Sequence, residues 1–250
     1  MIELKSPEQV GKIRSASRVL VDVLNILKTH IKAGVKTKEL DSIAFEEIEL
    51  RKARPAFLGY RGFPGSICTC INEEIVHGIP GQRKLKESDI LSIDIGVEFD
   101  GYFSDAAVTV AVGKVNRATH KLLDVTKEAL CKAIDKTNTG YRISDISSAI
   151  QEHVEGNKLS VIRDFVGHGI GLKLHEDPQI PNFGQRGMGT RIKEGMVLAI
   201  EPMVSAGKWE VAVLNDGWTA ITQDRSLTAH FEHTIAVTAE GPEVLTEGII

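Results

Sequence analysis

The stretch from Ser92 to Val110, SIDIGVEFDGYFSDAAVTV, decides how the chain folds. Its two ends are rich in β-branched residues, and the Asp100–Gly101 pair between them is a turn signal, so the stretch predicts an antiparallel hairpin. If the hairpin folds about its centre, Asp94 and Asp105 lie directly opposite each other on one face, with Cβ atoms about 5 Å apart. Two carboxylates so close repel unless a proton or a cation lies between them. The pattern fits either a solvated strand face or a carboxylate pair that binds a metal.

The composition is that of a soluble globular protein, because 42% of the 250 residues are hydrophobic and 26% are charged. The length allows one large or two small domains. The net charge of −4, with acids and bases mixed along the chain, gives no nucleic-acid footprint. The chain has no apolar run long enough for a membrane span or a signal peptide. Three cysteines form no disulfide framework, so a reducing cytoplasm is the expected location.

The order of predicted elements before and after the hairpin is similar. Ser6 caps a long amphipathic helix, and Thr37 can cap a second one. After the hairpin come another amphipathic helix and one that Ser144 can cap, so a single domain of residues 1–250 would consist of two similar halves, about 1–112 and 113–250. Further strands are expected around residues 196–201, 211–214 and 231–238.

A short internal match supports this repeat. The segment ESDILSID, which ends at Asp94, aligns without gaps on EGMVLAIE, which ends at Glu201. Strand partners follow each of these acids, Asp105 in the first half and Glu232 in the second. A pseudo-twofold structure would bring the four carboxylates together between its halves, where such a cluster needs cations.

Histidines complete the candidate metal site. His168 lies between Gly167 and Gly169, where small neighbours let the backbone approach a ligand closely. His175 follows seven residues later and offers a second imidazole. Oxygen and imidazole ligands suit divalent ions such as Mn, Fe, Co and Zn, which often occur in pairs in hydrolytic sites. A structural role in a glycine-rich loop is the alternative for His168.

With these residues in place, the chain resembles the type I methionine aminopeptidases, in their short bacterial form. The resemblance extends over nearly the whole chain and includes the strings NEEIVHGIP, GHGIG, HEDPQIPN, AIEPM and FEHT. It implies an α+β fold, the pita-bread fold of M24 metallopeptidases, with a pseudo-twofold pair of ααβ halves around a central antiparallel sheet. The motif residues match in order: His77, Asp94, Asp105, His168, His175, Glu201 and Glu232.

The resemblance implies two divalent metal ions, with Co, Mn, Fe, Zn and Ni all open. Asp94 would bind one ion, and His168 and Glu201 the other, while Asp105 and Glu232 would bridge them. A water or hydroxide between the ions would attack the first peptide bond. Glu201 would also carry the proton between this water and the leaving amine.

Further residues would bind the substrate. By resemblance, His175 would donate to the scissile carbonyl, and His77 would contact the substrate backbone and assist proton transfer. A narrow, polarizable pocket suits methionine. Leu174 stands where relatives usually have an aromatic residue, which leaves the shape of the pocket open. By resemblance, the walls of this pocket are Tyr60, Phe63, Cys68 and Trp218.

The implied activity is removal of the initiator methionine from nascent proteins in the cytoplasm by a monomer, with preference for a small second residue. Contact with the ribosome and redox sensitivity of Cys68 or Cys70 stay open. Prolidases and Xaa-Pro aminopeptidases share the fold but usually carry an extra N-terminal domain. Creatinase-like enzymes lack the acidic ligands that are complete here, and non-catalytic binding proteins of this fold lose them.

Overall fold

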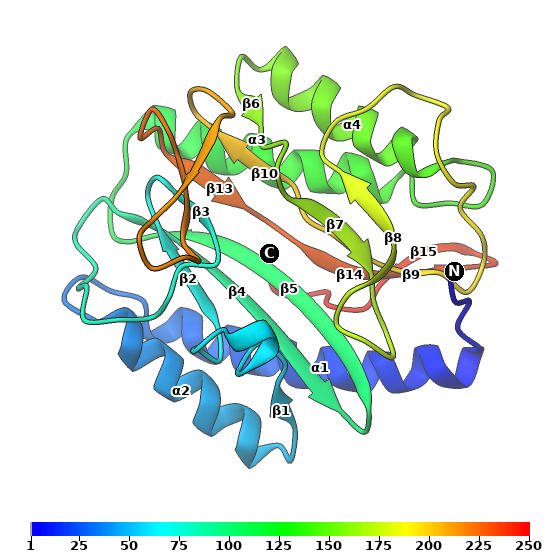
Figure 1. The fold of residues 1–250 in the computed structure, drawn as a ribbon, viewed down its shortest axis with the longest axis horizontal. Helices are drawn as coiled ribbons and strands as arrows, with labels where there is room; N and C mark the ends of the chain where they lie inside the picture. The colour runs from blue at the N-terminus through cyan, green and yellow to red at the C-terminus, as the bar shows by residue number, and fades with distance from the viewer. Residues whose placement is uncertain (1) are drawn as a thin grey trace.

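The computed structural model describes residues 2–250, whose four α-helices enclose a set of antiparallel strands, and a short 3-10 helix, η1, covers Tyr60–Gly62. Helices α1 (Pro7–His30) and α2 (Thr37–Leu50) lie along one side of the strands, and α3 (Arg117–Ile134) and α4 (Ile143–Gly156) along the opposite side (Figure 1). Among the described residues, no helix is both long enough and apolar enough to cross a membrane.

Helix α1 begins where its capping box predicts. The Ser6 hydroxyl accepts a hydrogen bond from the Gln9 N–H at 3.3 Å, and the Gln9 side chain accepts one from the Ser6 N–H at 2.9 Å. The helix buries one apolar side against the strands, through residues that include Ile13, Leu20, Leu24 and Leu27.

The predicted caps of the second and fourth helices are wrong by one or two residues. Lys36 is the N-cap of α2, because the buried Thr37 hydroxyl is already hydrogen-bonded to the backbone of Gly81. Arg142 is the N-cap of α4, and Ser144 lies inside the helix, where its hydroxyl hydrogen-bonds the backbone of Met188.

The hairpin forms, but with another register than the sequence predicts. Strand β4 (Ile90–Phe99) pairs with β5 (Tyr102–Ala111) around a two-residue turn at Asp100 and Gly101, both of which have positive φ. The turn is thus centred one residue later than expected. Asp94 therefore lies opposite Ala107, and Asp105 opposite Gly96. The two acids are diagonal neighbours on the same face rather than a directly opposed pair.

The other strands are shorter. The three further strands expected from the sequence are β9 (Val197–Ile200), β11 (Val211–Val213) and β14 (His233–Thr238). The remaining strands are β1 (Arg54–Pro55), β2 (Cys68–Ile71), β3 (Glu74–Val76), β6 (Ser160–Val161), β7 (Val166–Gly169), β8 (Glu176–Pro181), β10 (Met203–Ser205), β12 (Ala220–Thr222), β13 (Thr228–His230) and β15 (Gly241–Val244).

These strands form four antiparallel sheets, and β5 lies beside β13 and β14 of two of the others. β4 carries β5 on one edge and β1 and β2 on the other, and the five-stranded sheet has the order β15-β14-β9-β7-β8. The first sheet is joined to β14 through Thr234, whose hydroxyl donates to the Asp105 carbonyl at 2.7 Å and accepts from its N–H at 3.0 Å. The Glu232 N–H donates to the Ala107 carbonyl at 2.9 Å. This junction brings acids from distant parts of the sequence together.

Candidate metal centre and substrate cavity

Four carboxylates converge where β5 meets the strands of the second half. Asp94 and Asp105 project from the same face of the hairpin, Glu201 directly follows β9, and Glu232 lies between β13 and β14. Asp105 and Glu232 are buried, and the other two are half-buried. The sequence thus correctly predicts that these four residues lie close together.

Burial leaves several of these oxygen atoms without partners. Asp94 Oδ1, Asp105 Oδ1 and Glu232 Oε1 have no hydrogen-bond partner among the described residues. Burying an ionised carboxylate without a compensating partner costs several kcal/mol, so the cluster favours either protonation or a bound cation.

The pKa values of all four carboxyls are raised accordingly. Burial raises the pKa of Asp94 to about 7. Burial, followed by the charges of Glu232 and Asp94, raises the pKa of Asp105 well above its usual range. Burial and neighbouring carboxylates likewise raise the pKa of Glu201 and Glu232. A carboxylate cluster of this kind is ionised at neutral pH only when positive charge is supplied.

His168, on β7, faces this cluster. Its Nε2 lies 3.6 Å from Glu201 Oε1 and 3.9 Å from Asp105 Oδ2, and its Nδ1 is 2.9 Å from the Gly169 carbonyl. An Nδ1–H that donates to this carbonyl leaves the Nε2 lone pair directed at the carboxylates. Burial lowers the pKa of His168 to about 4, so the ring is neutral at pH 7.

The glycines beside His168 allow this placement. A Cβ atom on Gly167 would lie 2.5 Å from the Ala199 carbonyl oxygen, and one on Gly169 would overlap the Asp177 carbonyl. Only glycine lets β7 approach its neighbours so closely. The two glycines are therefore required by the close packing of β7, the strand that carries the imidazole.

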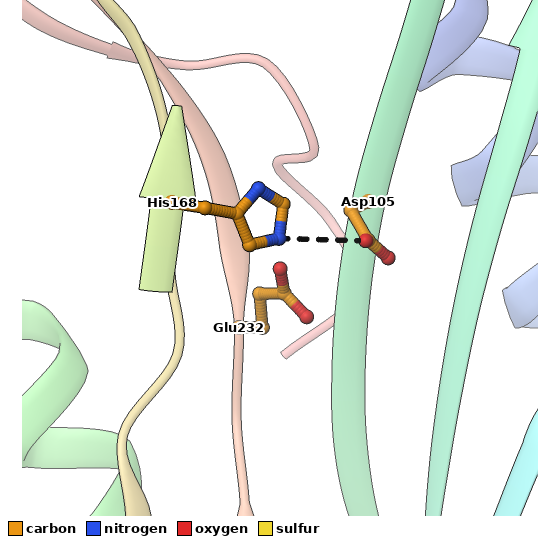
Figure 2. Close-up of side chains that lie close together, drawn as sticks. All are labelled: Asp105, His168 and Glu232. Atoms are coloured by element: carbon orange, nitrogen blue, oxygen red, sulfur yellow. Dashed lines mark ion pairs between the residues drawn. The ribbon is translucent and has the colours of Figure 1, made fainter. Parts of the chain in front are cut away.

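The donor set fits a divalent cation. Asp105, His168 and Glu232 each offer one ligand atom, and these atoms lie within 4.8 Å of one another (Figure 2). Figure 2 shows the three side chains pointing toward a common space from β5, β7 and the segment before β14. Oxygen and imidazole donors suit Mn, Fe, Co and Zn. The unpartnered oxygens and this donor set therefore match a site for divalent metal.

A cavity of about 320 Å³ opens above the carboxylates. All the predicted metal ligands and substrate-binding residues line it, together with residues that the sequence reasoning did not single out. The predicted set consists of Asp94, Asp105, His168, Glu201, Glu232, His77, His175, Tyr60, Phe63, Cys68 and Trp218, and the additional residues include Phe57, Arg61 and Phe165.

His175 stands on one wall of the cavity. Its ring stacks on Tyr60 with centroids 5.2 Å apart, and its Nδ1 lies 3.0 Å from the Tyr60 hydroxyl. Desolvation by the surrounding protein, together with His168 and Arg61, lowers the pKa of His175, so this ring is also neutral. The contact with Tyr60 fixes its orientation toward the cavity.

His77 occupies another wall. It has a left-handed backbone conformation, with φ of 59°. Its ring meets Phe165 and Trp218 edge to face, with centroids 5.4 and 6.2 Å away. Burial lowers its pKa. A non-glycine residue with positive φ is uncommon, and here it holds an imidazole against two aromatic rings of the cavity.

Two questions left open by the sequence are settled by burial. Cys68 and Cys70 are both buried, and burial raises the pKa of each thiol, so neither has the exposed thiolate of a redox-sensitive cysteine. Leu174 is buried in the apolar cluster that contains Phe63 and Cys68, and it does not line the cavity.

The sequence reasoning missed His230. This buried histidine lies two residues before Glu232, and its Nε2 is 3.7 Å from Glu201 Oε2 and 3.9 Å from Glu232 Oε2. Its signal in the sequence is the alternation HFE, since residues two apart in an extended segment share a face.

Comparisons with known proteins agree with this geometry. A model of metallopeptidase family M24 matches residues 11–239. Methionine aminopeptidase 1 of Bacillus subtilis is 52% identical over 246 residues, which cover 98% of this chain and 99% of that protein. Methionine aminopeptidase of Clostridium perfringens is 48% identical with the same coverage.

Solved structures point the same way. The crystal structure of methionine aminopeptidase from Thermotoga maritima has a TM-score of 0.97 at 45% identity and covers 98% of this chain and 99% of that chain. Prolidase from Pyrococcus furiosus, at 22% identity and a TM-score of 0.77, shares the pita-bread fold, but this chain covers only 65% of its length. Fold, buried donor set and relatives agree, and the chain belongs to metallopeptidase family M24 and, within it, to the methionine aminopeptidases.

Proposed function

We propose that the enzyme removes the N-terminal methionine from newly made polypeptides in the cytoplasm, acting as a monomer with two divalent metal ions. The observation that carries the proposal is the position of the cavity, which has the acidic cluster as its floor and aromatic side chains as its walls. A substrate chain would enter from the open side with its terminal side chain against the aromatic walls and its first peptide bond near the carboxylates.

Five residues would hold the ions. Asp94 would bind one ion and His168 the other, Glu201 would join His168, and Asp105 and Glu232 would be shared. The unpartnered oxygens of Asp94, Asp105 and Glu232 support these roles. When bound, the ions would lower the pKa of a water molecule and polarise the scissile carbonyl.

Glu201 would move the proton. It lines the cavity, half-buried, beside the other carboxylates that would hold the ions, so it would lie within reach of a water molecule near them. Glu201 would take the proton of the attacking water and return it to the leaving amine.

His175 would stabilise the developing charge on the carbonyl oxygen. The Tyr60 hydroxyl would donate to its Nδ1, so that the proton of the neutral ring is on Nε2. That Nε2–H is a donor that needs no change of protonation state during the reaction. His77, held between Phe165 and Trp218, would contact the substrate backbone and assist proton transfer.

The methionine side chain would bind against Tyr60, Phe63, Cys68 and Trp218. Phe63 and Trp218 pack edge to face with centroids 5.2 Å apart, which gives a fixed apolar surface. An unbranched thioether fits such a surface and makes favourable contacts with aromatic edges. A small second residue would be preferred, because a larger one would meet the walls beside the carboxylates.

The test is hydrolysis of Met-Ala-Ser, Leu-Ala-Ser and Pro-Ala-Ser by metal-stripped protein, with and without added Mn²⁺ or Co²⁺. We expect cleavage of the methionine peptide alone, and only after metal is restored. Cleavage of the leucine or proline peptide would contradict the proposed side-chain pocket. A second series, Met-Ala-Ser against Met-Phe-Ser, tests the preference for a small second residue, and equal rates would contradict it.

A further inference from the structure

His230 is a buried imidazole whose ring nitrogens have no hydrogen-bond partner in the part of the chain that the structure describes. It ends β13, and only 2% of its surface is exposed. Buried ring nitrogens are normally hydrogen-bonded, so an unpartnered pair calls for an explanation. None of the roles assigned above to the metal ligands, the proton carrier or the substrate-binding residues uses this side chain.

The backbone of His230 is held rigidly. Its N–H donates to the Thr109 hydroxyl at 2.8 Å, and the same hydroxyl donates to its carbonyl at 2.9 Å. The residue also pairs with Met203 of β10. Because Thr109 belongs to β5, the hairpin that carries Asp94 and Asp105 fixes where this imidazole is placed. The position of the His230 backbone beside the carboxylates is therefore fixed by the junction between the sheets.

The ring is directed at the outer oxygens of two proposed metal ligands. His230 Nε2 lies 3.7 Å from Glu201 Oε2 and 3.9 Å from Glu232 Oε2. His168 faces the other oxygen of Glu201, Oε1, at 3.6 Å. The Glu201 carboxylate thus lies between two imidazoles, each near a different oxygen atom.

The two imidazoles differ in what fixes their protons. His168 Nδ1 lies within hydrogen-bond distance of the Gly169 carbonyl, which favours a proton on Nδ1. The Nε2 lone pair of His168 is then available to bind a cation. His230 has no such contact, so its proton can be on Nε2, where two carboxylate oxygens are the nearest acceptors. A small contraction of these distances when a cation draws the carboxylates together would give hydrogen bonds of ordinary length.

We propose that His230 is a positioning residue whose Nε2–H holds the outer oxygens of Glu201 and Glu232. It thereby determines which oxygen each carboxylate presents to the divalent cation. This inference rests on the proposed metal-binding roles of the two glutamates. Partners that orient metal ligands commonly change metal affinity by 10- to 100-fold when they are removed.

The test compares His230→Gln with His230→Leu. Glutamine keeps an N–H donor at a similar distance from the backbone, whereas leucine fills the space without one. Mn²⁺ binding to metal-stripped protein is measured by calorimetry. We expect the affinity of the glutamine variant to stay within about 3-fold of that of the parent and the affinity of the leucine variant to fall by about 10- to 100-fold.

Three controls separate this effect from others. His153→Leu changes a histidine of α4 that contacts Glu128 of α3, outside the cavity, and should leave Mn²⁺ affinity unchanged. Circular dichroism and thermal unfolding show whether each variant is folded. The visible absorption spectrum of the Co²⁺-loaded protein reports on its ligand set, and it should be the same in the parent and in His230→Gln.

Each outcome of this test either supports or contradicts the positioning role of His230. If folded His230→Leu binds Mn²⁺ as the parent does, the positioning role is wrong. If His230→Gln loses affinity as the leucine variant does and its Co²⁺ spectrum changes, His230 is itself a metal ligand and the positioning role is again wrong. A parent protein that binds no Mn²⁺ would instead overturn the proposed metal site, on which this inference depends.

Discussion

The backbone of Asp105 helps to hold the two sides of the molecule together, and its side chain belongs to the candidate metal site. Its N–H and carbonyl are both hydrogen-bonded to the Thr234 hydroxyl, which joins the two sides of the molecule. Its carboxylate lies in the candidate metal cluster, with Oδ1 unpartnered. The backbone contacts do not depend on the side chain, so the two roles can be separated by mutation.

We expect Asp105→Asn to lose metal and activity while it stays folded. The amide has nearly the same shape but lacks the negative charge and the second carboxylate oxygen. The measurements are metal content after dialysis against Mn²⁺ and turnover of Met-Ala-Ser. The control is Asp224→Asn, a carboxylate in an exposed loop that caps the N–H groups of Lys208 and Ser226. Full metal content and turnover in Asp105→Asn would exclude a ligand role.

Tyr60→Phe should lower kcat by about 2- to 10-fold, since a neutral hydrogen bond contributes roughly 0.5–1.5 kcal/mol. The ring still stacks on His175, but the hydroxyl that fixes the proton of this imidazole is gone. KM for Met-Ala-Ser should change little, because the apolar wall is retained. Tyr102→Phe, on the hairpin next to Lys12 and outside the cavity, is the matched control. An unchanged kcat would show that His175 is not oriented by this hydroxyl.

At the scale of elements, the packing of the hairpin against Ala56 and Phe57 depends on Gly96. It lies opposite Asp105, and a Cβ atom there would be 2.7 Å from Phe57 Cε1 and 3.0 Å from Ala56 Cβ. A side chain at this position would push Phe57, which lines the cavity, away from the strand. The hairpin thus needs a small residue on the strand across from the aspartate it presents.

Gly96→Val should destabilise the protein by about 1–3 kcal/mol, as expected for overpacking in a closely packed core. The free energy of unfolding is measured with urea, and KM for Met-Ala-Ser should rise because Phe57 moves. Gly156→Ala, at the end of α4 with nothing within 4 Å of the new Cβ, is the control and should be neutral or slightly stabilising. Equal stability of Gly96→Val and the parent would contradict this packing.

The elements that could be predicted are those with long periodic patterns. The capping box and the apolar periodicity predict α1, and the β-branched ends predict β4 and β5. Strands of three residues such as β10, β12 and β13 have no usable periodicity, since they are defined by their neighbours in space. The register was missed because turn geometry, rather than the symmetry of the sequence stretch, determines it.

The same distinction holds for the site. The cluster of Asp94, Asp105, Glu201 and Glu232 could be predicted because acids interrupt apolar strands at matching places in the two halves. The alternation of His230 with Glu232 indicates only that the two residues share a face, and the role of His230 depends on packing between β13 and β5, which the sequence does not show. The equivalence of the halves, about 1–112 and 113–250, stays a prediction.

At the scale of the whole molecule, the buried carboxylates make stability depend on pH when metal is absent. Their folded-state pKa values are raised above those of the unfolded chain, to about 7 for Asp94. Their contribution is therefore fully present at low pH and is lost as pH rises through the folded-state pKa. The histidines with lowered pKa, which include His168 and His233 at about 4, act in the opposite sense, and their effect disappears as the pH rises above the ordinary histidine pKa of about 6.5.

We therefore expect the Tm of the metal-free protein to fall between about pH 7 and pH 8, where the histidines are largely neutral in both states. Saturating Mn²⁺ should raise Tm and remove this fall, because the cation stabilises the ionised carboxylates. Thermal unfolding of stripped and loaded protein across this range is the measurement. A Tm of the stripped protein that rises toward pH 8 would contradict the raised pKa values.

The Thr234 hydroxyl is hydrogen-bonded to the backbone of Asp105, although the two residues are 129 positions apart in the sequence. Every chain is synthesised from its N-terminal end, so the hairpin exists well before the strand that completes the donor cluster. A chain that ends before Glu232 lacks one member of the donor cluster, so the complete metal site would form only when nearly the whole chain has been made. The order of synthesis would therefore delay peptide cleavage until the complete fold is present.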